Sequence, residues 1–294
     1  MPPISIVFTG TPDFAVPSLE ALLENPAFQV SLVITQPDRP TGRKQTLTSP
    51  PVKVIAQSHG IPVWQPENIN AQWDDKPPVP APDFLVVVAY GQILKSVILE
   101  WPAIAPVNVH ASLLPRWRGA SPIHHAILSR DTETGVTIQR MVEALDAGPI
   151  LSAERVTIGA EETTPQLHDR LAHMGAQLLI GTLQSPLHET PQDTTHVTVC
   201  HKITKAMGEI DPSVQTAQEI ERTVRALQPW PGVRYTFDGE ECKILEAEAS
   251  AAADATTENT VVLQCKNNTT LYIRKLQPAG GKPMTAMEWK RGRR

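Results

Sequence analysis

The sequence has few cysteines, few aromatic residues and no long apolar run. Among 294 residues it contains three cysteines, and aromatic residues make up 5%. Cys200, Cys242 and Cys265 are odd in number and lack the spacing of a disulfide framework or a zinc site. A reducing compartment, the cytoplasm, fits this pattern best. No apolar run reaches the roughly 18–20 residues of a membrane-spanning helix, so we expect no membrane association.

Two further absences narrow the class of protein. The apolar segment 4–8 has no basic region before it, so we expect a first strand rather than a signal peptide. The lone Gly10 after it falls far short of the Gly-x-Gly-x-x-Gly fingerprint, so no nucleotide cofactor is inferred. Proline, by contrast, is abundant at 28 residues, which indicates many turns and stiff loops.

The alternation of apolar and turn-rich segments predicts an α/β domain over residues 1–183. A chain of this length is long for a single core, so two domains are expected. Strands and helices alternate, which predicts a Rossmann-like parallel sheet with helices on both faces. The predicted strands are 4–8, 30–34, 62–64, 84–89, 103–109, 135–142 and 150–158, and the predicted helices are 15–24, 52–60, 122–129 and 167–183.

The remainder of the chain predicts a linker and a small β domain. Segment 184–204 is rich in proline, threonine and other polar residues, as linkers are. Residues 205–294 combine one helical segment with short strands and hairpin signals, which predict a C-terminal β-barrel of the oligonucleotide-binding type. The predicted helix is 217–227, the strands are 233–237, 242–246, 260–265 and 271–276, and 247–255 is expected to be a surface loop. Trp230 is expected in the core.

Charge is unevenly distributed along the chain. The net charge is −5, but residues 205–294 hold 13 lysines and arginines against 12 acids. In the last 21 residues seven basic residues accompany a single acid, Glu288. A basic end on an acidic chain is suited to phosphate, with release of counterions. A solvated tail explains the same pattern equally well.

Asn108 and His110 are the strongest candidates for a functional site. They are two residues apart at the end of the predicted strand 103–109, so their side chains should point to the same face. The loop that follows carries Pro115 and Gly119, which end regular structure. Polar groups at the carboxyl end of a strand are where open α/β sheets place their sites.

These residue types suggest acyl-group chemistry. The amide of Asn108 offers a neutral donor to a developing oxyanion, and His110 can carry a proton near neutral pH. Ser112 lacks a Gly-x-Ser-x-Gly context, so we expect the substrate to bring the nucleophile. Asp146, in a turn-rich segment, is the carboxylate that would orient or charge His110. On the strand-end argument alone, a hydrogen-bonded core histidine remains the commoner alternative.

Specific motifs add a family resemblance. Asn108-Val109-His110, Ser112-Leu113-Leu114-Pro115 and Leu145-Asp146-Ala147-Gly148 resemble the signature of the 10-formyltetrahydrofolate-dependent formyltransferases. Further segments resemble the tRNA-dependent members of that family over nearly the whole chain, namely Gly10-Thr11-Pro12-Asp13-Phe14, Thr35-Gln36-Pro37-Asp38-Arg39-Pro40-Thr41-Gly42-Arg43, Ala89-Tyr90-Gly91, Gln228-Pro229-Trp230-Pro231-Gly232 and Gln277-Pro278-Ala279-Gly280.

The resemblance implies a reaction and a set of site residues. It implies formyl transfer from 10-formyltetrahydrofolate to the α-amine of methionine esterified to initiator tRNA, a step of translation initiation. Asn108, His110 and Asp146 would be catalytic, and no metal would be needed. Ser112, Leu113, Leu114 and Pro115 would border the folate.

The resemblance also implies a tRNA-binding loop. Segment 35–51 is longer than usual connections, and its Arg43 would contact the acceptor arm. Arg43 is followed here by Lys44-Gln45-Thr46, whereas the family often carries further lysines. We therefore expect weaker or more salt-tolerant binding by this loop. Without the resemblance, an inert proline-rich excursion would be the preferred interpretation.

Several alternatives stay open. The same first-domain motif would serve a small amine acceptor such as an amino sugar or glycinamide ribonucleotide, or water, and an inactive tRNA-binding module is a third possibility. Arg116 and Arg118 would bind phosphate or carboxylate, or be simply solvent-exposed. A zinc set is less expected than a solvated linker for four residues with irregular spacing, His188, His196, Cys200 and His201. A monomer is the default expectation.

Overall fold

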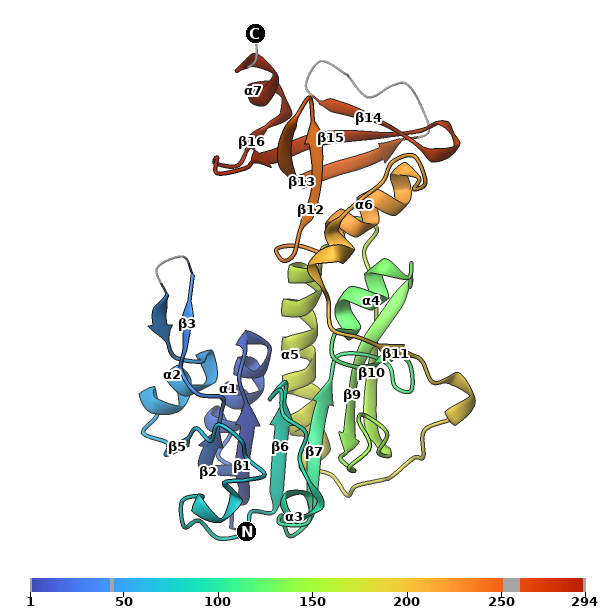
Figure 1. Cartoon of the computed structure of the whole chain (residues 1–294). Helices are drawn as coiled ribbons and strands as arrows, with labels where there is room; N and C mark the ends of the chain where they lie inside the picture. The colour runs from blue at the N-terminus through green and yellow to red at the C-terminus, as the bar shows by residue number, and fades with distance from the viewer. Residues whose placement is uncertain (1, 43–44, 251–259, 293–294) are drawn as a thin grey trace. The chain divides into compact units, whose positions relative to one another are not determined.

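The computed structural model describes residues 2–42, 45–250 and 260–292. The chain forms two compact units (Figure 1). The first unit comprises 1–122, 133–156 and 168–200, and the second comprises 123–132, 157–167 and 201–294. Two short segments of the first two-thirds of the chain thus belong with the second unit. The predicted division of the chain into a domain of residues 1–183, a linker and a domain of residues 205–294 stays a prediction.

The larger sheet has seven strands. Their bounds are β1 Ile4–Gly10, β2 Phe28–Ile34, β5 Val63–Trp64, β6 Phe84–Val88, β7 Ala105–His110, β9 Glu133–Arg140 and β10 Ile150–Thr157. Their order across the sheet is β10-β9-β7-β6-β1-β2-β5. Strands β1, β2, β5, β6 and β7 pair in parallel, which confirms the predicted Rossmann-like α/β architecture. All five residues of β6 are buried, as the uninterrupted apolar run predicted.

Helices connect and cover these strands. The α-helices of this part of the chain are α1 Val16–Glu24, α2 Pro51–Ser58, α3 Ser96–Leu99, α4 Pro122–Leu128 and α5 Thr164–Leu183, and the 3-10 helices are η1 Asp13–Ala15 and η2 Trp73–Asp75. The predicted helices are therefore confirmed, with shifts of one to three residues at most ends. Helix α3 and these two 3-10 helices were not predicted from the sequence.

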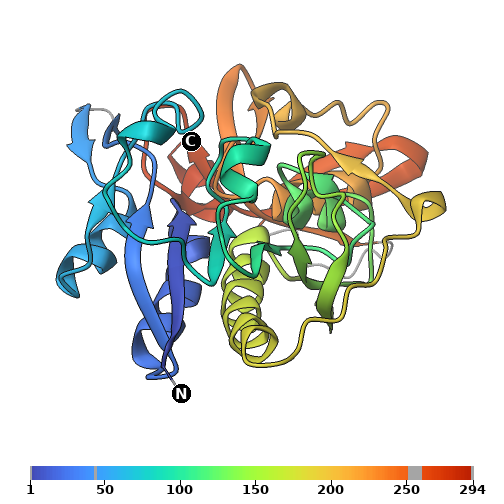
Figure 2. The ribbon, with the colours of Figure 1, turned by 90° about the horizontal axis from the view of Figure 1, so that it is seen from below.

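The two faces of β7 have different neighbours. Val109 points to the face covered by α5, where a Cβ added at Gly175 would lie 2.9 Å from the Val109 side chain. Figure 2 shows this helix, in yellow, alongside the strands. Because successive side chains alternate along a strand, Asn108 and His110 point to the opposite face. The longest helix of this part of the chain therefore does not cover them.

Two predictions about the first unit need correction. The sheet is not entirely parallel, because β9 runs antiparallel to β7, with His110 opposite Thr137 and Asn108 opposite Gln139. Segment 35–51 is not a plain loop, because β3 Arg39–Thr41 and β4 Thr46–Thr48 pair as a hairpin within it. Side-chain bonds such as that between Thr41 and Thr48 join the two short strands.

From residue 201 onward, the described part of the second unit contains an antiparallel sheet and two α-helices. The strands are β12 Val233–Phe237, β13 Glu240–Ser250, β14 Val261–Cys265, β15 Thr269–Pro278 and β16 Met284–Thr285, and the helices are α6 Ala217–Ala226 and α7 Ala286–Arg291. Their path is β12-β13-β15-β14, with β16 beside β15. Ile220, Val224 and Trp289 from the helices pack on the buried residues of the strands. Both helices begin with a capping box, Thr216 with Glu219 and Thr285 with Glu288.

The predicted β character and turns of this unit are confirmed, with two corrections. Both residues of Asp238-Gly239 have positive φ, as a two-residue hairpin requires. Among the described residues no pairing joins β12 to β14. The oligonucleotide-binding fold is itself a partly open barrel, so the barrel form stays a prediction. Strand β13 continues to Ser250 into the expected loop, and residues 251–259 lie outside the described part. Trp230 is 52% exposed rather than buried.

None of the described helices combines the length and the apolar composition needed to cross a bilayer.

Candidate active site

Asn108 lies in the middle of the larger sheet with its amide available. Its side chain is on β7 between Val87 of β6 and Gln139 of β9. The residue is 9% exposed, yet its side chain has no hydrogen-bond partner among the described residues. Buried polar side chains usually have a partner, so an amide held without one is suited to a substrate atom.

His110 is 6% exposed and has a polar neighbour at each ring nitrogen. Nε2 lies 2.9 Å from the carbonyl oxygen of Trp117. A carbonyl can only accept, so Nε2 carries a proton and donates it. Nδ1 lies 3.6 Å from Oδ1 of Asp146. That distance is longer than a hydrogen bond, so the carboxylate faces the ring without bonding to it directly.

Asp146 is held by contacts to both carboxylate oxygens. The backbone N–H of Gly119 donates to Oδ2 at 2.8 Å, and the side-chain amide of Gln139 donates to Oδ1 at 3.1 Å. The residue itself has φ +49°, in the left-handed region that few side chains adopt. Gln139 is opposite Asn108 in the sheet, so Asp146 is tied to the neighbour of Asn108 and also faces His110.

The structure thus brings together the three residues predicted to be catalytic. Their side chains lie on one face at the carboxyl end of β7, with Asp146 reaching them from the connection between β9 and β10. An amide donor, an imidazole that can be doubly protonated and a fixed carboxylate can together stabilise negative charge on a carbonyl oxygen. Their catalytic roles remain a prediction.

The predicted folate-bordering loop is only partly open. The Ser112 hydroxyl is fully buried and donates to the carbonyl of Arg116 at 2.6 Å. Leu114 is buried, whereas Leu113 and Pro115 are half-buried. Thr137 bonds the Ser112 carbonyl and accepts from the Leu114 N–H, which fixes the loop to β9. The Ser112 side chain is therefore structural, and the loop's contact with folate stays a prediction.

Arg118 and the predicted linker differ from expectation. Arg118 is half-buried and donates twice to Gln192, so it is not simply solvent-exposed, and its binding of phosphate or carboxylate stays a prediction. Cys200 is 2% exposed and lies in β11 Val199–Cys200, which pairs with β8 Arg118–Gly119. The segment before residue 201 is thus attached to the first unit rather than solvated along its length. Arg43 lies outside the described residues.

Four contributors to the site were not predicted from the sequence, namely Gln139, Gln192 and the backbone groups of Trp117 and Gly119. One feature of the sequence pointed to Gln139. It is two residues from Thr137, so both side chains lie on the same face of β9. Gln192 carried none, because its partners Arg118 and Asp146 are 74 and 46 residues away in the chain.

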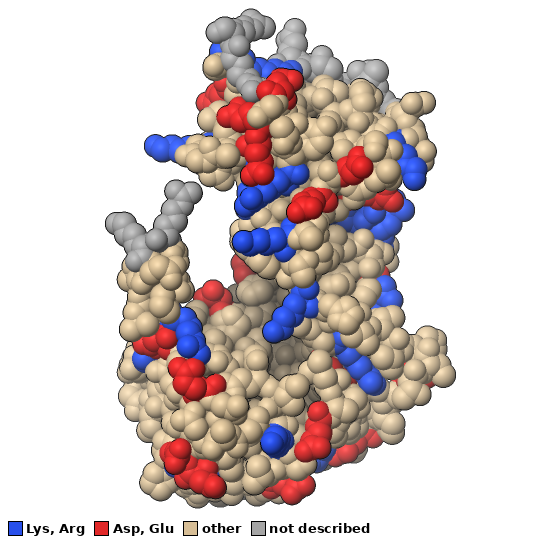
Figure 3. Space-filling view, viewed as in Figure 1, with Lys and Arg blue, Asp and Glu red and all other residues tan. Residues whose placement is uncertain are grey.

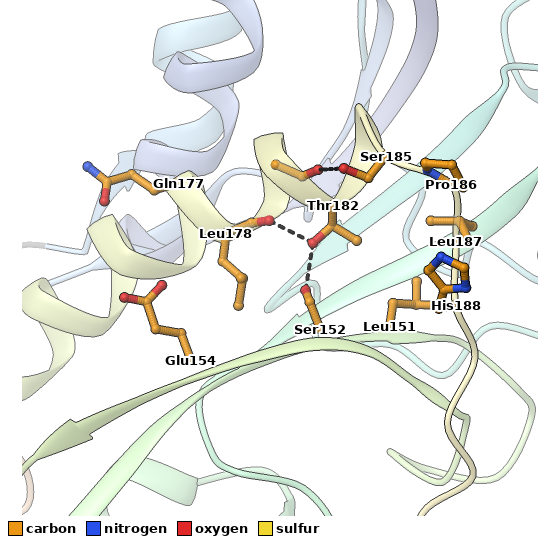
Figure 4. Close-up of a pocket in the computed structure, with 11 residues that line it drawn as sticks. Leu151, Ser152, Glu154, Gln177, Leu178, Thr182, Ser185, Pro186, Leu187 and His188 are labelled. Atoms are coloured by element: carbon orange, nitrogen blue, oxygen red, sulfur yellow. Dashed lines mark hydrogen bonds between the residues drawn. The ribbon is translucent and has the colours of Figure 1, made fainter.

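A cavity of the first unit and the charges on the second unit do not involve the three predicted catalytic residues. Figure 3 shows both basic and acidic side chains on the visible face of the second unit. A cavity of about 400 Å³ lies between β10, α5 and segment 185–188, with Ser152, Thr182 and His188 in its lining (Figure 4). Its lining includes none of the three predicted catalytic residues. Within the described part of the chain no cluster of three or more potential metal ligands occurs.

Family models match the chain along almost its whole length. The model described as formyl transferase matches residues 4–183, and that described as formyl transferase, C-terminal domain, matches residues 202–294. The methionyl-tRNA formyltransferase of Halorhodospira halophila is 45% identical over 300 residues, covering 98% of this chain and 96% of its own. That of Pseudomonas putida is 43% identical over 291 residues, covering 95% and 93%.

Solved structures with this fold include proteins crystallised with folates. WlaRD, a sugar 3N-formyl transferase studied with dTDP and 5-N-formyl-THF, has a TM-score of 0.68 and 18% identity, covering 95% of this chain and 99% of its own. HypX from Aquifex aeolicus, in complex with tetrahydrofolic acid, has a TM-score of 0.63 and 12% identity, covering 98% of this chain and 47% of its own. At these identities the likeness concerns the fold alone.

Proposed function

The chain belongs to the formyl transferase family, and from that premise we infer that it transfers a formyl group from a formyl-tetrahydrofolate to the amine of methionyl-tRNA. The acceptor follows from relatives that are 43–45% identical over nearly the whole chain. For the donor we propose 10-formyltetrahydrofolate, and for the acceptor the initiator tRNA. Such a substrate would place the protein in the cytoplasm. The monomer expected from the sequence stays a prediction.

One observation carries the proposed chemistry, namely the amide of Asn108 held without a protein partner on the face shared with His110. The neutral amine of methionine attacks the formyl carbon, a carbon–nitrogen bond forms, and the formyl oxygen becomes an oxyanion. Asn108 donates to that oxygen. A donor already in place costs no reorganisation when the charge develops, so it lowers the barrier.

His110 would act by exchanging its hydrogen-bond partner. In the structure its Nε2–H donates to the neutral carbonyl of Trp117. Hydrogen bonds to an ionised acceptor are roughly twice as strong as those between neutral groups, so the oxyanion competes for this proton better than the carbonyl does. The formyl oxygen of the unreacted donor, being neutral, lacks that advantage. The exchange would therefore stabilise the transition state more than the bound substrate, as catalysis requires.

Asp146 would keep His110 charged and take part in proton movement. When the tetrahedral adduct collapses, the bond between the formyl carbon and the folate nitrogen breaks. The incoming amine loses a proton and the departing folate nitrogen gains one. The carboxylate of Asp146 faces Nδ1 of His110 and is the nearest fixed anion in the site, so we assign it the stabilisation of the imidazolium and assistance in this transfer.

The acceptor distinguishes this proposal from its closest alternative. A sugar N-formyltransferase would use the same first-unit residues, and two such enzymes share the fold at 17–18% identity. The direct test offers labelled formyl-tetrahydrofolate to the protein with methionyl-initiator tRNA, a nucleotide-linked amino sugar or glycinamide ribonucleotide. We expect label on the charged tRNA only. Label on a small amine, with none on the tRNA, would replace the proposed acceptor.

A further inference from the structure

Gln192 is a buried polar side chain with all of its hydrogen-bonding groups occupied. It is 9% exposed and lies in the segment that the sequence analysis predicted to be a linker. Its Oε1 accepts from Nε and a terminal nitrogen of Arg118, at 3.0 and 2.7 Å. Its Nε2 donates to the carbonyl oxygens of Asp146 and Gly148, at 2.9 and 2.7 Å. Both ends of the turn that carries Asp146 are therefore held by one side chain.

The direction of these hydrogen bonds is fixed by Arg118. A guanidinium can only donate, so the oxygen of Gln192 must face it. The amide nitrogen is then directed at the two carbonyls, which can only accept. A reversed amide would place oxygen against both carbonyls and nitrogen against the guanidinium, losing every bond. The amide of Gln192 therefore has only one orientation between the guanidinium and the two carbonyls.

The turn that Gln192 holds is tightly restricted. A Cβ added at Gly148 would lie 1.8 Å from the carbonyl oxygen of Arg140, so the backbone approaches β9 too closely for any side chain. Asp146 has φ +49°, a conformation that persists only where its surroundings enforce it. The bonds from Gln192 supply such enforcement at a buried position.

Residues 192–200 also support the carboxylate of Asp146 through the backbone around Gly119. The carbonyl oxygens of Thr198 and Cys200 accept from the N–H groups of Arg118 and Ala120, on either side of Gly119. The N–H of Gly119 then donates to Oδ2 of Asp146 at 2.8 Å. Residues 192–200 thus hold Asp146 through its backbone and also position the donor to its side chain.

We propose that Gln192 is a positioning residue for the formyl transfer, acting through Asp146 and oriented by Arg118. The inference rests on the proposed function, since it assigns Gln192 to the support of that catalytic carboxylate. Gln192 would not touch either substrate. Its loss should therefore lower kcat and leave KM for both substrates nearly unchanged. A misplacement of a catalytic group by about 1 Å can cost roughly 10²-fold in rate, so we expect a kcat loss of about 10–100-fold.

The test compares Gln192→Met with a matched control. Methionine has the length of glutamine but cannot bond Arg118 or the carbonyls. Gln184→Met makes the same chemical change at an exposed position eight residues earlier in the same segment, and should leave kcat unchanged. Gln192→Glu restores the acceptor for Arg118 but sets a carboxylate oxygen against two carbonyls, so it should be no better than methionine. An unchanged kcat in Gln192→Met, or a glutamate variant with wild-type kcat, would overturn the proposal.

A double variant separates positioning from general damage. If Gln192 acts through Asp146, then Gln192→Met should cause little further loss of kcat in an Asp146→Asn background. Equal losses in both backgrounds would show that Gln192 acts independently of the carboxylate and would contradict the proposal.

Amide hydrogen exchange decides the point without reference to activity. We expect the peptide containing Gly119 to exchange faster in Gln192→Met than in wild type or Gln184→Met, because the bond to Asp146 weakens. Unchanged exchange there would overturn the positioning role, even if the protein formylates methionyl-tRNA. Conversely, faster exchange in a protein that leaves methionyl-tRNA unformylated would sustain the positioning of Asp146 and refute the proposed function.

Discussion

Nδ1 of His110 lies 3.6 Å from Oδ1 of Asp146, and Nε2 of the same imidazole donates to the carbonyl of Trp117 at 2.9 Å. The carboxylate is also bonded by Gly119 and Gln139, so it cannot turn away from the ring without losing both contacts. In this arrangement the Nε2–H of His110 donates to a neutral carbonyl and could donate instead to a stronger acceptor. The proposed mechanism depends on that relationship and on the free amide of Asn108.

Replacing Asn108 tests the proposed oxyanion donor. Asn108→Ala should lower kcat about 10²–10³-fold, since losing one oxyanion donor costs roughly 2.7–4 kcal/mol of barrier. Asn108→Asp should be worse, because a carboxylate there would repel the developing charge. Single-turnover formylation rates measure both effects. Gln57→Ala, which truncates an exposed amide on α2, is the control and should behave as wild type. Near wild-type turnover by Asn108→Ala would remove this residue from the mechanism.

Replacing Asp146 tests the charge on His110. Asp146→Asn keeps an acceptor for the Gly119 N–H but removes the negative charge, so kcat should fall about 10²–10⁴-fold, the range typical of acid–base groups. The chain offers a matched control in Asp169→Asn, where an exposed aspartate lies 2.9 Å from His168. That variant should keep its activity. Equal activity of the two variants would contradict the assignment.

Two glycines should respond oppositely to alanine. At Gly119, with φ +120°, a Cβ would lie 2.2 Å from the carbonyl oxygen of Cys200, so Gly119→Ala should separate β8 from β11. The strained backbone alone should lower the free energy of unfolding by about 1–3 kcal/mol. At Gly181, inside α5, an added Cβ meets nothing within 4 Å. Gly181→Ala should therefore stabilise the protein by about 0.5–1 kcal/mol.

Denaturant titration of the two glycine variants and wild type measures both changes. A Gly119→Ala protein as stable as wild type would mean that the close approach of β8 and β11 is not maintained in solution.

Cys200 predicts how stability depends on alkaline pH. Burial raises the pKa of the Cys200 thiol above its usual 9.0, and the nearby charge of Asp146 raises it further. The unfolded chain therefore ionises first. The contribution of this thiol to stability is complete below about pH 9 and is lost as the pH rises toward the folded pKa. Between pH 8 and 11, the thermal stability of Cys200→Ala should decline less steeply with pH than that of wild type. Parallel declines of the two proteins would contradict the burial of the thiol.

The apolar pattern predicted the central part of the fold. The apolar run of β6 and the short, mostly apolar segment of β7 indicated both strands, and the carboxyl end of β7 indicated the position of Asn108 and His110. The direction of β9 could not be read, because alternation along a strand is the same whichever way it runs. Composition was also a poor guide to segment 184–204, where proline and threonine suggested a solvated linker.

The support of the site was harder to predict than the site itself. Asn108 and His110 are neighbours on one strand, so local spacing was enough to pair them. Gln192 acquires its role only from Arg118 and Asp146, which folding brings to it from distant parts of the chain. A glutamine in a polar segment has no local feature that distinguishes it from a solvated one.

The most direct test of the proposed function follows labelled formyl from 10-formyltetrahydrofolate in the presence of methionyl-initiator tRNA or methionyl-elongator tRNA. The proposal predicts rapid, stoichiometric labelling of the initiator species and little or none of the elongator species. Equal labelling of the two, or folate consumption without label on either, would contradict it.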